Sequence, residues 1–308
     1  MTPTPNRAPD ARLVLFMLAL TAIWGLNALA TKVITNGMTP AMAAAMRGAV
    51  ALVFLAGYGL ARRQPPRAPA RVYGLAVISG LMLAADFLLF FSGARLTTGG
   101  QLSIFINTAP LFVAVGAHFL LRGERLHTAK ALGLLLSCLG IVALFSADLL
   151  PPGEGHWRGN LLVLGSSLAW GASTLFVKRF LADRIDTFQL HSIRILVSTP
   201  LLLLVSLGFE SDPFFAVTAR TWAMLIFQGT VTVGFSYLMW LALLKRYPAS
   251  AVQALTVLSP VWAVALGMAL LDERLTPAML LGMVLVGLGL LLVGRPGPRP
   301  APAKPAAG

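Results

Sequence analysis

Charged residues are scarce in this chain. Asp, Glu, Lys and Arg make up 11% of its 308 residues, whereas they make up about a quarter of an ordinary soluble domain. Hydrophobic residues make up 57%, which is far too many for a chain that folds in water. The composition therefore excludes a soluble domain and predicts an integral membrane protein.

Residues that build disulfides, metal sites and catalytic centres are also few. The one cysteine, Cys138, excludes an internal disulfide, and the four histidines, at positions 118, 127, 156 and 191, are too scattered for a metal site. The sequence contains no Gly-rich loop ending in Gly-Lys-Ser/Thr, no Gly-x-Ser-x-Gly and no His-Glu-x-x-His. We therefore expect no cofactor, no metal, no built-in ATPase and no enzymatic activity, so that any transport is driven by gradients.

Ten apolar runs are long enough to cross a bilayer, which takes a helix of about 20 residues. The sequence thus predicts an all-α membrane protein with ten transmembrane helices and no room for a soluble domain between them. The helices are expected at roughly residues 13–32, 41–61, 72–94, 99–121, 129–147, 158–178, 188–208, 221–243, 249–271 and 277–294.

The basic residues predict the orientation of these spans. The net charge of +13 does not indicate nucleic-acid binding, because Lys and Arg lie singly or in small groups between apolar runs. With a cytoplasmic N-terminus, 17 of them face the cytoplasm and 5 the opposite side, while Arg47 and Arg194 lie inside spans. Cytoplasmic loops carry the excess of Lys and Arg, so we expect both termini in the cytoplasm of a bacterium. Residues 1–12 and 295–308 form tails, the second of them disordered.

The sequence contains an internal repeat of two similar halves. Trp24-Gly25, followed by Lys32, recurs as Trp170-Gly171, followed by Lys178. Further landmarks recur in the same order at an offset of about 146 to 150: Arg47 and Arg194, Pro110 and Pro260, Glu124-Arg125-Leu126 and Glu273-Arg274-Leu275, Gly133 and Gly282, and Gly140 and Gly289. Five spans in each repeat, an odd number, make the second repeat (158–294) run opposite to the first (13–147), across an extracytoplasmic linker at 148–157.

The same repeat argues against a signal peptide. Ala28-Leu29-Ala30 has the small-residue form of a cleavage site, after two arginines and an apolar run. Cleavage there would remove Trp24 and Gly25, whose partners lie within the second repeat. We therefore expect the first span to stay in the mature protein.

These landmarks resemble the drug/metabolite transporter superfamily, and within it the ten-helix bacterial transporters with two tandem EamA domains. The resemblance rests on the Trp-Gly pair that opens each half, the arginine in each second helix, the proline in each fourth and the glycine-spaced fifth helices, and it covers about residues 13–294. The nearest functional class is the amino-acid exporters of the bacterial inner membrane. The resemblance thus implies efflux of amino acids or similar metabolites.

Asp86 is the one carboxylate well inside a predicted span, where a charge costs about 2.5 to 3.5 kcal/mol. Arg47 lies at a similar depth in the preceding span, which leaves two hypotheses open: a structural ion pair, or an Asp86 that binds protons or substrate. In the repeat, Arg47 is matched by Arg194, but Asp86 is matched by Phe235. Because the arginine recurs without the acid, Asp86 is not required merely to neutralise Arg47. We expect Arg194 to be structural, with helix carbonyls or hydroxyls as its acceptors.

Aromatic and small polar residues predict a cavity between the two halves. Trp24 and Asn27 share one face of the first helix, and Trp170 lies on a similar face of the sixth helix. With Asp86 they complete the candidate substrate-binding set, whose other members are Asn107, Tyr237 and Gln253. Such faces suit a zwitterion with a bulky apolar side chain, but ordinary helix packing would use the same residues.

The prolines of the fourth and ninth helices predict moving parts. Pro110 and Pro260 each free a backbone carbonyl and bend a helix, which suits gating helices around a cavity, or else a fixed kink. His118 is expected to be a satisfied polar residue rather than a proton relay. The glycine pairs of the fifth and tenth helices predict close backbone contact in a scaffold.

The leading hypothesis is a secondary transporter that exports amino acids or related small metabolites by alternating access, with the site near the midplane. Proton coupling through Asp86 is an additional hypothesis. The alternative within the same fold is a carrier of phosphorylated or nucleotide-linked metabolites, with Arg47, Arg194, Lys32 and Lys178 as its candidate cations. An intramembrane enzyme is the least favoured. The lipid bilayer and a small-molecule substrate are the expected partners, without nucleic acid, and one chain is expected to function as a monomer.

Overall fold

A computed structural model describes residues 10–61, 68–121, 128–148, 156–259, 262, 266 and 276–293. The regular secondary structure of this part of the chain is helical, without strands, and seven helical stretches in it are long and apolar enough to cross a membrane. Each predicted span coincides with one or more helical segments, the ninth only as far as Ser259. The α-helices are α1 (Ala11–Thr35), α2 (Pro40–Leu60), α3 (Ala70–Leu96), α4 (Gly99–Ile106), α5 (Ala109–Leu120), α6 (Thr128–Asp148), α7 (Trp157–Phe180), α8 (Thr187–Phe209), α9 (Ala219–Phe227), α10 (Tyr237–Arg246), α11 (Ala249–Ala254) and α13 (Pro277–Val293).

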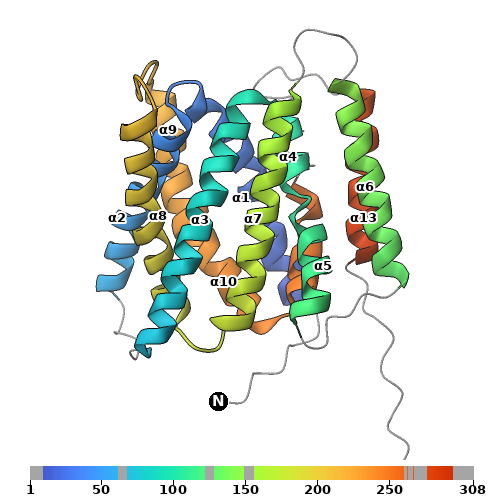
Figure 1. The fold of residues 1–308 in the computed structure, drawn as a ribbon, viewed down its shortest axis with the longest axis horizontal. Coiled ribbons are helices and arrows are strands. Elements are labelled where there is room, and N and C mark those ends of the chain that lie inside the picture. Colours follow the sequence, from blue (N-terminus) through green and yellow to red (C-terminus); the bar gives the residue numbers. More distant parts are fainter. Residues whose placement is uncertain are drawn as a thin grey trace, which may run out of the picture.

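The helices stand side by side in one bundle (Figure 1). α3 crosses its middle beside α7 and α8, and α6 with α13 forms a separate pair at one edge (Figure 1). Large apolar side chains project outward, with Leu60 90% and Phe209 88% exposed. Exposure of this kind is expected where lipid, not water, surrounds the helices.

Local sequence signals set the helix starts. The Asp10 side chain accepts a hydrogen bond from the backbone N–H of Leu13 at 2.9 Å and so caps α1. Asp186 caps α8 in the same way through Phe188, and Thr218 opens α9 in a reciprocal capping box with Thr221. Pro40 occupies the first turn of α2, where its missing N–H costs nothing.

The predicted fourth span is two helices rather than one. α4 ends at Ile106 and α5 begins at Ala109, directly before Pro110. Pro110 cannot donate to the carbonyl of Ile106, four residues earlier, so the helix breaks at this point. The Ser167 hydroxyl of α7 donates to the carbonyls of Phe105 (2.7 Å) and Ile106 (3.2 Å), which satisfies the groups that the break leaves open.

The predicted eighth span also departs from a regular helix. Between α9 and α10 the chain runs as a π-helix over Gln228–Ser236, within one continuous span Ala219–Arg246. The ring of His191, on α8, donates from Nε2 to the Val233 carbonyl at 2.7 Å. A π-helical turn adds a residue to the helix and re-aims the side chains after it, and such turns are frequent at functional sites.

Two lysines fasten helix ends in matching ways. Lys32, near the end of α1, donates from Nζ to the carbonyls of Ala94 (3.1 Å) and Thr97 (2.5 Å) at the end of α3. Lys178, near the end of α7, donates to the carbonyls of Leu244 (2.7 Å) and Tyr247 (2.9 Å) at the end of α10. A cation is favourable at a helix C-terminus, where unpaired carbonyls gather. The acceptors are 150 residues apart in the two cases.

The two lysines lie at opposite ends of the bundle. At the Lys32 end, Gly37 and Thr39 of the α1–α2 turn pair with the backbone of Ala216 and Pro213 in the α8–α9 loop. At the Lys178 end, the hydroxyl of Tyr247 donates to Asp10 at the start of α1.

Glu210 closes the Lys32 end as an N-cap from another helix. Its carboxylate accepts from the Thr39 hydroxyl (2.5 Å) and from the backbone N–H groups of Ala41 (2.8 Å) and Met42 (3.1 Å) at the start of α2. Partial burial raises the pKa of Glu210, but these hydrogen bonds lower it more, so that the pKa lies below its ordinary value.

The predicted close approach of the fifth and tenth helices is confirmed. A Cβ on Gly289 would lie 2.4 Å from the Gly133 carbonyl oxygen, and one on Gly140 would lie 3.0 Å from the Gly282 carbonyl oxygen. The two contacts are equivalent under the repeat, since each joins the first glycine of one pair to the second of the other. Backbones of α6 and α13 therefore touch at two symmetric points.

Candidate functional site

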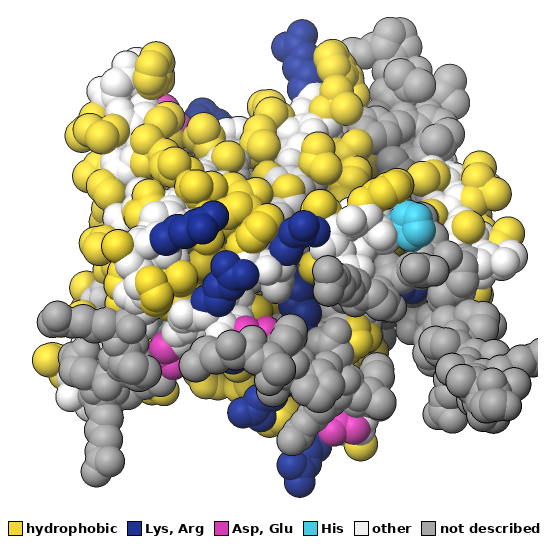
Figure 2. Space-filling view, turned by 60° about the horizontal axis from the view of Figure 1, so that its bottom comes forward, with side chains coloured by type: hydrophobic (Ala, Val, Ile, Leu, Met, Phe, Trp, Pro, Cys, Tyr) yellow, Lys and Arg dark blue, Asp and Glu magenta, His cyan; other side chains and the backbone are white. Residues whose placement is uncertain are grey.

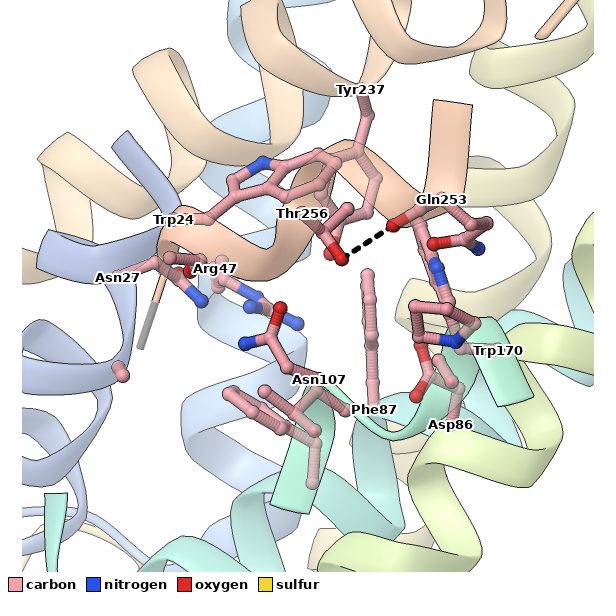
Figure 3. A pocket seen from close by; sticks show the side chains of 16 residues that line it. Trp24, Asn27, Arg47, Asp86, Phe87, Asn107, Trp170, Tyr237, Gln253 and Thr256 are labelled. Carbon is pink, nitrogen blue, oxygen red and sulfur yellow. Dashed lines mark hydrogen bonds between the residues drawn. The ribbon is translucent and has the colours of Figure 1, made fainter. Parts of the chain in front are cut away.

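A cavity of about 80 Å³ lies inside the bundle. All seven predicted substrate-binding residues line it, and they come from α1, α3, α4, α7, α10 and α11 or their ends (Figure 3). The described lining residues are Trp24, Asn27, Ala28, Arg47, Asp86, Phe87, Phe90, Ile106, Asn107, Ala109, Pro110, Trp170, Tyr237, Gln253, Thr256 and Ser259. The structure thus brings together residues up to 235 positions apart in the sequence.

Aromatic rings form one wall of the cavity. Tyr237 contacts Phe87 at 6.2 Å and Trp170 at 5.2 Å between ring centroids, and Trp24 and Trp170 both contact Trp240, at 5.3 and 5.9 Å. The rings are tilted or edge-on, the arrangements that aromatic pairs favour. Phe87 and Tyr237 are themselves 150 residues apart, so two equivalent residues of the repeat meet here. Trp240 lies behind the wall, buried and outside the lining.

Amides supply polar groups around the cavity. Asn107 ends α4, and its Nδ2 donates to the Ser103 carbonyl at 2.7 Å. Asn27 is 9% exposed, and its Oδ1 finds no hydrogen-bond partner. Gln253 likewise keeps an unpartnered Nε2, although its backbone carbonyl accepts from Thr256. Buried hydrogen-bonding groups that have no partner in the protein are costly, and a polar ligand can supply the partner.

Asp86 is 4% exposed, on the cavity side of α3. Its Oδ1 accepts a hydrogen bond from the Ser166 hydroxyl of α7 at 2.6 Å. The sequence interpretation missed Ser166, although a hydroxyl one turn before Trp170 on a cavity helix was a usable signal. The carboxylate is therefore anchored by a neutral donor.

Arg47 and Asp86 form no ion pair in the structure, which was one of the two hypotheses that the sequence left open. Nε and Nη2 of Arg47 have no hydrogen-bond partner, and its guanidinium lies over the rings of Phe87 (4.0 Å) and Phe91 (4.5 Å). Each cation–π contact of a desolvated guanidinium is worth up to about 2 kcal/mol. Similar depth in the membrane placed both charges at the cavity, but Phe87 stands between them (Figure 3).

The repeat counterpart of Arg47 is arranged differently. Nη2 of Arg194 donates to the Ser173 hydroxyl at 3.0 Å, one acceptor of the predicted kind, whereas its Nε is buried without a partner among the described residues. Arg194 is buried but is not among the lining residues. The two arginines therefore do not converge on the cavity, and neither do Lys32 and Lys178, which bind helix ends.

The counterpart of Asp86 also needs correction. The carbonyls that accept from Lys32 and from Lys178 are 150 residues apart, so equivalent residues in this part of the two halves differ by 150. This offset pairs Asp86 with Ser236 rather than with Phe235. Phe235 is 47% exposed on the outside of the bundle, whereas Ser236 is buried and accepts from Nε1 of Trp24 at 2.9 Å. The π-helix adds the residue that the sequence alignment of the halves missed.

The remaining predicted residues fall in three places. Pro110 lines the cavity beside the α4–α5 break. His118 lies farther along α5 and is absent from the lining, with its ring 4.8 Å from that of Phe119. Pro260 lies outside the described residues, as do Glu124 and Glu273. Within the described residues, no three His, Cys, Asp or Glu side chains gather in a way that could hold a metal ion.

Sequence comparison decides the family. The EamA-like transporter family matches the chain twice, over residues 11–146 and 157–295. The chain belongs to the EamA-like transporter family. The family makes the protein a membrane transporter.

Similar proteins in several bacteria support this membership over nearly the full length. A probable amino-acid metabolite efflux pump of Escherichia coli is 27% identical, with 89% of this chain and 92% of that protein covered. An uncharacterized transporter of Bacillus subtilis, YoaV, is 26% identical, with 91% and 96% covered. An uncharacterized protein of Pseudomonas aeruginosa is 31% identical, with 94% and 97% covered.

A solved crystal structure shares the fold of this EamA-like chain. Its TM-score is 0.71 at 22% sequence identity, and the match covers 92% of this chain and 98% of that one. At this identity the likeness concerns the fold alone.

Proposed function

We propose that this EamA-like protein is a secondary transporter that exports amino acids or related small metabolites across the bacterial plasma membrane by alternating access. The observation that carries the proposal is the cavity, which seven polar and aromatic residues from both repeats line together. Secondary transporters with internal repeats bind substrate near the midplane, at the interface of the repeats. The efflux-pump relative in E. coli supports amino-acid metabolites as the substrate class.

Inversion of the two halves is part of the proposal. Lys32 and Lys178 make the same pair of bonds within their own halves, yet at opposite ends of the bundle. Equivalent residues at opposite ends are expected from repeats that cross the membrane in opposite senses. The glycine contacts between α6 and α13 support the same relation, because they are symmetric when the halves are exchanged.

Cytoplasmic termini are supported by the distribution of charge. Lys and Arg side chains gather on the end of the bundle that comes forward in Figure 2, below flanks that are mostly hydrophobic. Helix ends on this side carry Arg12, Arg71, Arg179, Arg184 and Arg246. By the positive-inside rule this end faces the cytoplasm.

The cavity favours a small substrate. Its volume of about 80 Å³ is well below the roughly 300 to 1,000 Å³ of pockets that hold drug-sized ligands. A nucleotide-linked metabolite would need more room and several converging cations, and of the four candidates only Arg47 lines the cavity. The structure therefore favours amino acids over phosphorylated compounds. Since both halves of one chain contribute to the described lining, we propose a functional monomer.

Proton coupling through Asp86 is a separate part of the proposal. Asp86 is a buried carboxylate at the cavity and has no counter-ion within bonding distance, so that it can change its charge as conditions change. Asp86→Asn is expected to abolish the pH dependence of transport in proteoliposomes. If both the rate and its pH dependence survive the substitution, coupling through Asp86 is excluded.

Counterflow tests the transport proposal itself. Proteoliposomes loaded with a mixture of the twenty standard amino acids are diluted into a trace of the labelled mixture, and transient accumulation of label is followed. A carrier accumulates label because the unlabelled substrate inside occupies the binding site as it returns to the outside, so that little label leaves. This accumulation saturates with the concentration of the labelled substrate. Absence of accumulation for every amino acid would exclude the proposed substrate class. A linear, unsaturable flux would indicate a channel.

A further inference from the structure

Arg47 keeps hydrogen-bond donors that the protein does not use. Its side chain is 1% exposed, and Nε and Nη2 are buried without a partner in the part of the chain that the structure describes. The rings of Phe87 and Phe91 contact the charge, but a ring face does not fill the in-plane N–H donors of a guanidinium. A buried cation with empty donors is unfavourable until an anion reaches it.

Asp86 is not that anion. Its Oδ1 is bound to the Ser166 hydroxyl, and Figure 3 shows Arg47 and Asp86 on either side of Phe87. Among the described lining residues, these two are the charged ones, so the cavity presents a cation and an anion that are held apart. A ligand with one positive and one negative group close together would satisfy both.

We propose that Arg47 is the carboxylate receptor of the cavity, so that the transported molecule is a zwitterion whose carboxylate binds Arg47 and whose ammonium group faces Asp86. This assignment rests on the proposed amino-acid export. The guanidinium suits the task because its planar edges present parallel N–H pairs that match the two oxygens of a carboxylate. The amides of Asn27 and Asn107 also line the cavity and offer further polar groups to such a ligand.

Arg194 shows what a structural arginine looks like in this fold. It occupies the equivalent helix of the second half, donates to Ser173 and is absent from the lining. Both arginines keep a buried Nε that has no partner among the described residues, but only Arg47 lines the cavity, so only Arg47 can present its donors to a ligand there. A phosphate monoester fits less well, since its two negative charges would meet one cation and the carboxylate of Asp86.

Competition in the counterflow assay tests the assignment. For the amino acid that wild-type protein exchanges most strongly, the competitors are the unlabelled amino acid, its carboxamide and its decarboxylated amine. Wild type is expected to favour the free acid by about tenfold or more over both derivatives, because they lack the charged acceptor. Arg47→Gln is expected to reduce this preference to less than about threefold, while Arg194→Lys, the matched control, keeps it.

Ligand-induced thermal stabilisation in detergent gives a second readout that needs no transport. The free acid should raise the melting temperature of wild type and of Arg194→Lys but not of Arg47→Gln; if that variant cannot be purified, Arg47→Lys is compared, with a weakened shift expected. Equal competition by acid and carboxamide in wild type, or an unchanged preference in the Arg47 variant, would overturn the carboxylate assignment alone. Failure of wild type to exchange any amino acid would overturn the transport proposal and this assignment with it.

Discussion

The Ser166 hydroxyl determines the surroundings of Asp86. It donates to a carboxylate that is 4% exposed, and a hydrogen bond to a charged group contributes about 1.5 to 3 kcal/mol. We expect Ser166→Ala to lower the free energy of unfolding by about this amount and to lower the melting temperature in detergent.

Ser79→Ala is the matched control for this substitution. Ser79 is a fully buried serine of α3 whose hydroxyl has no partner, so its removal should be neutral or stabilising. Equal destabilisation by the two substitutions would show that the Asp86–Ser166 bond contributes nothing particular.

At the level of single residues, the sequence predicted which side chains reach the cavity but not their partners. Aromatic and amide residues at helical spacing located the seven lining residues, because a polar face on an apolar helix must turn inward. An Arg47–Asp86 ion pair was one of two hypotheses, and it rested on depth along two helices. Depth does not give the rotation of each helix about its axis, and this rotation places Phe87 between the charges and turns Asp86 toward Ser166.

The N-terminus of α2 depends on a carboxylate from α8. Glu210 binds it only when ionised, and its pKa is below its ordinary value. A depressed pKa means that the stabilisation is present at neutral pH and is lost as the pH falls through the folded-state pKa. We expect Glu210→Gln to lower the melting temperature at pH 7, with the difference from wild type shrinking toward zero in acid.

Melting curves of both proteins from neutral to acidic pH would check this prediction. A difference that stays constant over the whole range would show that the charge of Glu210 does not contribute to the cap.

The contact between α6 and α13 leaves no room for side chains. A Cβ on Gly289 would lie 2.0 Å from the Ser137 hydroxyl and 2.4 Å from the Gly133 carbonyl, so Gly289→Ala must push two backbones apart. We expect a loss of about 1 to 3 kcal/mol in the free energy of unfolding, as for other overpacked contacts.

Gly57→Ala provides the control for the glycine contact, because nothing lies within 4 Å of a Cβ at that position of α2. It should stabilise the protein by up to about 1 kcal/mol through helix propensity. Melting temperatures of the two variants should therefore shift in opposite directions, and a shift of the same sign would contradict the close-contact account.

At the level of helices, the sequence located the spans and missed their irregularities. Apolar runs set the helix positions because about 20 residues are needed to cross the hydrocarbon. Pro110 predicted a bend. A full break of the helix also needs hydrogen-bond donors for the carbonyls that it frees, and Ser167, which lies on α7 and is remote in the sequence, donates to two of them. The π-helix over Gln228–Ser236 left no signal in the apolar pattern, because one extra residue does not change its overall hydrophobicity.

In the molecule as a whole, the contacts of the scaffold recur in both halves, whereas the charged groups at the cavity do not. The lysine bonds, the glycine contacts and the Phe87–Tyr237 pair repeat between the halves. The charged groups do not, since Asp86 is matched by Ser236 and Arg47 by an arginine outside the lining. Polar groups that differ between the halves suit an asymmetric substrate, because they favour one orientation of it in the cavity.

Accessibility labelling of equivalent loops tests the inverted arrangement most directly. Cys138 is the one cysteine of the chain, so a Cys138→Ser background accepts single reporters at Asn36, between α1 and α2, and at Asp183, between α7 and α8. Both positions are exposed. In intact cells, a membrane-impermeant thiol reagent should label Asn36→Cys from outside and reach Asp183→Cys only after the membrane is opened. Labelling of both positions from the same face would contradict inversion, and with it the shared cavity on which the transport proposal rests.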